Sequence, residues 1–196
     1  MAVRSLKTGL YSRSLLVGNT ATSNSYESIA TQTVGAGGAA SVTFSSIPQT
    51  YTHLEIRGIS RTASTGTYAI FRPNGDANTA NYTLHMMYGN GSAVTPYTSA
   101  SGVFDGAYVW YGSASSGMAN YFGPGVVTIL DYKNTSKYKT LDCISGTDNN
   151  GASVGYVFRA SSAWLNTAAI TSLTIVGQSG NLAEYSTFAL YGIKSA

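Results

Sequence analysis

The chain has 196 residues and a net charge of +3, and only 10% of its residues are charged, against roughly 25% in a typical globular protein. This length suits one domain with its own core, and 11 basic residues dispersed among 8 acidic ones do not build a nucleic-acid groove. No run approaches the roughly 18 apolar residues of a membrane helix, and a single cysteine excludes an intramolecular disulfide.

Residues 1–25 are predicted to form an N-terminal arm, distinct from a domain at 26–196. The arm is rich in Ser and Thr and basic, because the first acid of the chain is Glu27. Its apolar triplet at 15–17 is too short for a secretory signal, so we expect synthesis in a cytoplasm without export. A solvated tail and a docking arm for an acidic partner fit this pattern equally well.

Residues 51–61 carry the clearest strand pattern. The apolar Leu54 and Ile56 alternate with the polar His53 and Glu55, and turn-forming residues flank the run on both sides. Successive side chains of a strand point to opposite faces, so this alternation predicts a core strand with one dry face.

Short runs of the same kind recur along the chain, separated by Gly, Pro, Asn and Ser. They predict further strands at 26–34, 40–44, 67–72, 81–88, 107–112, 125–132, 138–144, 154–159, 170–176 and 187–193. The run at 125–132 is apolar on both faces, which predicts a strand covered on both sides. Residues 92–105 are expected to form a long loop, and 164–169 a helical turn or a bent connection.

No segment keeps a helical period, so the predicted fold is all-β: an antiparallel β-sandwich, with a jelly roll as its expected form. An immunoglobulin-like sandwich is the second choice, since one cysteine cannot supply its Cys, Trp, Cys signature. Cys143 lies in an alternating run, which predicts a buried structural thiol.

Groups for catalysis and metal binding are scarce, with two His, one Cys and eight carboxylates. His53 and His85 are expected to make structural hydrogen bonds, because no acid-rich or His-rich neighbourhood offers a metal its ligand set. The Asn-Gly-Asp run at 74–76 is expected to form a plain turn rather than a calcium loop. We therefore expect no metal, no cofactor and no enzymatic activity.

Three aromatic residues, Tyr108, Trp110 and Tyr111, fall in the predicted strand at 107–112. They form either a shelf on which sugar rings stack, or part of the core and of a subunit interface. Strand alternation places Tyr108 and Trp110 on one side and Tyr111 on the other, so at least one side is expected to be buried.

Several short motifs, spread over most of the chain, together carry a resemblance to one protein family. They are SLKTG at 5–9, SRSLLVGN at 12–19, YTHLEIR at 51–57, FRPNGD at 71–76, NY at 81–82, YGNG at 88–91, ILDY at 129–132, KYKT at 137–140 and STFALYGIK at 186–194. In these motifs the chain resembles a family of small structural proteins of tailed bacteriophages, especially those of cyanobacteria and marine bacteria.

The resemblance implies a virion component with a β-sandwich body, used as a capsid decoration (cement) protein or in a tail fibre. The short chain, without a coiled-coil segment, and its low charge favour the capsid exterior. The expected partners are the major capsid protein and further copies of the chain in a homotrimer, with no nucleic acid and no membrane. The expected capsid-docking residues of the arm are Arg4, Lys7, Arg13, Leu15, Leu16 and Val17.

Two alternatives remain. The first is a tail-fibre or receptor-binding protein that recognises a host-surface glycan with the three aromatics and the loop at 92–105. The second is a glycan hydrolase, which needs a pair of carboxylates. The strand-borne candidates are Glu55, Asp131 and Asp142, and their spacing does not favour this chemistry.

Overall fold

The computed structural model describes residues 25–148 and 155–194, and it confirms an all-β sandwich of two antiparallel sheets. In order across the large, eight-stranded sheet lie β1 (Tyr26–Thr33), β12 (Thr187–Ile193), β3 (His53–Ser60), β8 (Gly123–Ile129), β9 (Lys139–Thr147), β10 (Tyr156–Trp164), β5 (Tyr82–Gly89) and β6 (Val94–Ser99). The small, four-stranded sheet has the order β2 (Ser41–Phe44), β11 (Leu173–Gly177), β4 (Tyr68–Pro73) and β7 (Ala107–Tyr111).

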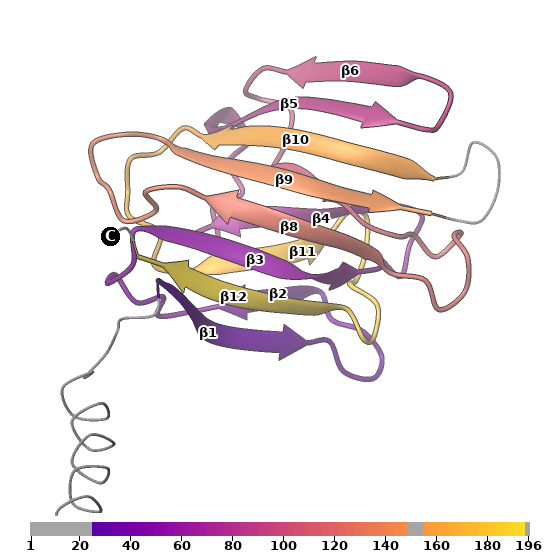
Figure 1. Cartoon of the computed structure of the whole chain (residues 1–196), viewed down its shortest axis with the longest axis horizontal. Coiled ribbons are helices and arrows are strands. Elements are labelled where there is room, and N and C mark those ends of the chain that lie inside the picture. The colour runs from indigo at the N-terminus through magenta and orange to yellow at the C-terminus, as the bar shows by residue number, and fades with distance from the viewer. Residues whose placement is uncertain (1–24, 149–154, 195–196) are drawn as a thin grey trace, which may run out of the picture.

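Figure 1 looks onto the large sheet, with the small sheet behind it. The large sheet is the wider of the two: β5 contacts β7 at the edge of the small sheet, and β6 lies beyond it. The jelly-roll topology and the domain boundary after residue 25 stay predictions.

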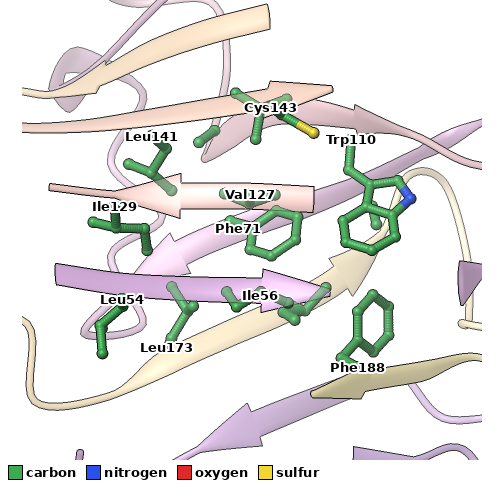
Figure 2. Close-up of a cluster of buried hydrophobic side chains, with 14 of the residues drawn as sticks. Leu54, Ile56, Phe71, Trp110, Val127, Ile129, Leu141, Cys143, Leu173 and Phe188 are labelled. Atoms are coloured by element: carbon green, nitrogen blue, oxygen red, sulfur yellow. The ribbon is translucent and has the colours of Figure 1, made fainter. Parts of the chain in front are cut away.

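The core lies between the sheets and is built from side chains at alternate strand positions. Figure 2 shows part of it: Leu54, Ile56, Phe71, Trp110, Val127, Ile129, Leu141, Cys143, Leu173 and Phe188. The expected core strand is confirmed as β3, because Leu54 and Ile56 are fully buried while its other face is not. Cys143 is buried as predicted, and burial raises the pKa of its thiol to about 12.

One connection differs from expectation, and another follows one of its two expected forms. The predicted loop at 92–105 contains the strand β6, which pairs with β5 only and so forms one edge of the large sheet. An edge strand tolerates Pro96, because a missing N–H on its free side breaks no ladder bond. After the buried Trp164, which ends β10, the chain forms a bent connection and not a helical turn.

The strand predicted to be covered on both sides is covered on one. In β8, Val127 and Ile129 are fully buried, whereas Val126 is half-buried and Leu130, just after the strand, is 52% exposed. The second layer of the sandwich lies on one side of the large sheet only, so the apolar residues on the other side of β8 face outward.

The Asn-Gly-Asp run forms a turn, as predicted, with Asn74 and Gly75 at positive φ of 52° and 69°. One carboxylate oxygen of Asp76 accepts hydrogen bonds from Trp164 Nε1 and Asn81 Nδ2, both at 2.7 Å, and the other accepts one from the Asn78 N–H at 2.8 Å. Partial burial opposes ionisation of Asp76, but these three bonds outweigh it and hold the pKa of the carboxyl below its usual value.

Replacing Asp76 by alanine is expected to lower the free energy of unfolding by about 2 kcal/mol at neutral pH, because the buried Trp164 N–H loses its charged acceptor. The pKa of Asp76 is lower in the folded than in the unfolded chain. The contribution of the Asp76 carboxylate to the free energy of unfolding is therefore complete above about pH 4, and it is lost as pH falls through the folded-state pKa. Urea unfolding of both proteins at pH 7 and pH 3 checks this, and an equal deficit at both pH values would contradict it.

Candidate functional site

The residues expected to dock on a capsid, Arg4, Lys7, Arg13, Leu15, Leu16 and Val17, lie outside the described residues. Within 25–148 and 155–194, no three His, Cys, Asp or Glu side chains gather as a metal site would require. No helix in this part of the chain has the length and apolar character needed to cross a membrane.

Both histidines make the structural hydrogen bonds expected of them. The ring Nδ1 of His53 accepts the backbone N–H of Asp131 at 3.0 Å, and Nε2 of His85 lies 2.9 Å from the Thr98 hydroxyl. The three carboxylates considered for hydrolysis are each engaged by a cation: Glu55 by Arg57, Asp131 by Lys137 and Asp142 by Arg159.

Several exposed apolar side chains lie on the outer face, the side of the large sheet that faces away from the small sheet. Six apolar side chains that lie on it form what we call the apolar stripe: Ile59, Met87, Val94, Val126, Ile144 and Val157. Val157 is 72% exposed, Val94 70%, Ile144 57% and Met87 54%. Exposed apolar side chains gathered on one face are a feature of interaction sites.

Strand register brings the stripe together from six strands, and Ile59 on β3 lies opposite Pro124 on β8. Ile144 on β9 lies directly opposite Val126 on β8 and Arg159 on β10, and Arg159 lies opposite Met87 on β5. Val157 lies opposite Gly89, which lies opposite Val94 on the edge strand. Residues as far apart in the chain as Met87 and Arg159 thus become neighbours on one face, which no local sequence pattern reveals.

Two shallow hollows lie on this face. One, of about 580 Å³, spans β9, β10, β5 and β6 and includes Met87, Pro96, Asp142 and Arg159. The other, of about 440 Å³, lies over β8, β9 and β10 and includes Pro124, Val126, Ile144 and Val157. The outer face is therefore uneven, and side chains of a partner would fit into its two hollows.

Charged groups on the outer face occur as pairs. Arg159 contacts Asp142 at 2.6 Å, and Arg57 contacts Glu55 at 2.5 Å. Tyr26 donates a hydrogen bond to Glu55 at 2.8 Å, and its ring stacks on Tyr191 at 4.8 Å. The face carries little net charge, so apolar contact is what it mainly offers to a partner.

The expectation that Trp110 belongs to a sugar-binding shelf is wrong, because the side chain is fully buried. Its ring packs against Phe71 at 6.0 Å and Phe188 at 5.6 Å, and its Nε1 donates to the Gly123 carbonyl at 3.3 Å. A Cβ on Gly125 would lie 2.6 Å from the indole, so Gly125 makes room for the ring. The core alternative holds for this residue.

Tyr108 and Tyr111 are half-buried and belong to an aromatic cluster at the overhanging end of the large sheet. Tyr108 contacts Phe104 at 4.5 Å and donates to Asp105 at 3.2 Å. Tyr111 contacts Tyr156 of the large sheet at 5.3 Å, and it lies opposite Tyr68 on β4, whereas the adjacent Trp110 lies opposite Ala69.

Tyr111 also lines a small pocket, which we call the tyrosine pocket. Its six residues are Tyr68, Met86, Tyr88, Tyr97, Tyr111 and Tyr156. Sequence reasoning missed four of these tyrosines because they come from separate strands. The available signal was the spacing of Met86 and Tyr88, which puts both on one side of β5.

No protein-family model matches this chain, and no curated protein matches it. The outer face and the tyrosine pocket are thus the two features of the described residues from which a role can be inferred.

Proposed function

We propose that the protein is a structural component of a bacteriophage virion, a capsid decoration protein that docks on the shell of major capsid protein subunits through its outer face. The apolar stripe is the observation that carries this proposal. When a partner covers its exposed valine, isoleucine and methionine side chains, the free energy of the complex falls by roughly 25 cal/mol per Å² of apolar area buried.

The features of the face suit a permanent contact. Its ion pairs, Arg159 with Asp142 and Arg57 with Glu55, are already formed, so a partner covers paired rather than isolated charges. A protein that binds only the assembled shell stabilises it by mass action. In this proposal the basic arm adds a second contact, and a homotrimer presents three equal faces to a local threefold axis.

Coating of shells that lack this protein tests the docking face. Changing Ile144 and Val157 to aspartate places charge in the middle of the contact, and we expect each change to weaken coating at least about tenfold. Val103→Asp is the matched control, because Val103 is 59% exposed but lies in the loop after β6, away from the outer face. Cosedimentation with shells gives the measurement, and normal coating by the double variant would refute the docking face.

The number of copies per virion separates this function from the tail-fibre alternative. Quantitative mass spectrometry against the major capsid protein is expected to give hundreds of copies. About a dozen copies would assign the protein to the tail, where symmetry leaves few positions.

A further inference from the structure

We propose that the tyrosine pocket binds one neutral hexopyranose ring of a glycan. The pocket opens toward the small sheet, although Met86, Tyr97 and Tyr156 also border the hollows of the outer face. It would take a different kind of ligand, so this inference does not depend on the proposed function.

The pocket exists because the two sheets have unequal widths. Tyr68 on β4 and Tyr111 on β7 form a cross-strand pair at the edge of the small sheet. Met86 on β5 and Tyr97 on β6 form a cross-strand pair at the end of the large sheet, where β6 lies beyond that edge. The two pairs face each other across a space of about 240 Å³, smaller than the roughly 300 Å³ at which sites for drug-sized ligands begin. A single sugar ring matches this space.

The rings line the pocket on more than one side. Tyr68 meets Tyr111 at an interplanar angle of 85°, Tyr111 meets Tyr156 at 62°, and Tyr156 meets Tyr88 at 76°. These near-perpendicular contacts hold the side chains in place before a ligand arrives, which lowers the entropic cost of binding. An aromatic face carries negative charge density, which attracts the weakly positive C–H groups on the flat side of a pyranose.

The polar groups of the pocket suit a neutral polyol. None of the six lining residues is charged, so neither a phosphate nor a carboxylate finds a counter-ion here. Burial raises the pKa of the Tyr68 and Tyr111 hydroxyls, so both stay neutral. The hydroxyl of Tyr68 donates weakly to the Met86 sulfur at 3.9 Å. Those of Tyr88, Tyr97 and Tyr156 bond no other residue in the described part of the chain, so they are available to sugar hydroxyls.

Saturation-transfer NMR with the methyl glycosides of glucose, galactose, mannose and N-acetylglucosamine tests the proposal. At least one is expected to bind saturably in the millimolar range. Tyr97→Ala should weaken this binding about tenfold, and Tyr97→Phe, which keeps the ring, should weaken it less. Tyr97 is suited to the test because it is 42% exposed on an edge strand, so its loss should leave the fold intact.

Tyr138→Ala is the matched control, since this tyrosine is 58% exposed and does not line the pocket. The proposal is overturned if none of the four glycosides binds, or if Tyr97→Ala binds as well as the unchanged protein. Saturable binding of choline chloride in place of the glycosides would also overturn it and identify an aromatic cage for cations. Tyr97 also borders the larger hollow of the outer face, whereas Tyr88 lines only the tyrosine pocket. Tyr88→Ala is therefore expected to weaken glycoside binding and to coat shells normally, so failure of the pocket and failure of the docking face give different results.

Discussion

Replacing Lys139 by methionine is expected to lower the free energy of unfolding by about 3 kcal/mol or more. The residue is fully buried, and its ammonium group donates to three backbone carbonyls: Asn134 at 2.5 Å, Lys137 at 2.9 Å and Thr167 at 3.0 Å. Burial lowers the pKa of Lys139, and the three carbonyls are the partners that a buried cation requires.

Methionine keeps the length and apolar stem of lysine but leaves all three carbonyls without their donor. These carbonyls belong to the turn between β8 and β9 and to the connection after β10, so the change should loosen both loops together. Lys133→Met, an exposed lysine in the same turn, is the control and should change stability by less than about 0.5 kcal/mol. Urea unfolding followed by circular dichroism measures both, and equal midpoints for the two variants would contradict the prediction.

Trp110→Ala is the second change with a large expected effect, about 3–5 kcal/mol. The variant removes a fully buried ring that packs against Phe71 from the small sheet and Phe188 from the large one. For a protein of this size the melting temperature should fall by about 10 °C. Tyr138→Ala, which removes an exposed aromatic side chain, should leave it nearly unchanged.

A double-mutant cycle with Gly125 makes this prediction specific. Gly125→Ala alone should destabilise the protein by about 1–3 kcal/mol, because the new Cβ would lie 2.6 Å from the indole ring. In the Trp110→Ala background the added methyl group enters the vacated space, so its cost should vanish or reverse. Additive effects of the two changes would show that Trp110 and Gly125 do not share this contact. Calorimetry of the four proteins gives the answer.

Much of the fold was predictable because a half-buried strand requires apolar and polar residues to alternate within its own sequence. The alternation of Leu54 and Ile56 with polar neighbours predicted β3, and the same period put Lys139 in phase with the buried Leu141 and Cys143. In an edge strand this alternation is weaker. β6 is exposed at nearly every position and contains Pro96, so its sequence resembles that of a loop.

The functional surfaces were less predictable, since each is assembled from separate strands. Tyr111 was identified from sequence, but its partners Tyr68, Tyr88 and Tyr156 come from β4, β5 and β10. Trp110 is of a residue type that is common in binding sites, but its side chain lies in the core. Whether an aromatic residue faces ligand or core depends on which sheet covers its strand, and the sequence of that strand does not record this.

The sequence by itself determined the all-β class, most strand positions and many residues of the core, because period-two burial is a property of each strand alone. Only the tertiary structure decided that no other described element covers one side of the large sheet and that the β6 end of this sheet extends past the small sheet. Those two facts depend on long-range pairing and on the unequal widths of the sheets. They place the apolar residues of β8, β9 and β10 on one exposed face and gather five dispersed tyrosines around a pocket.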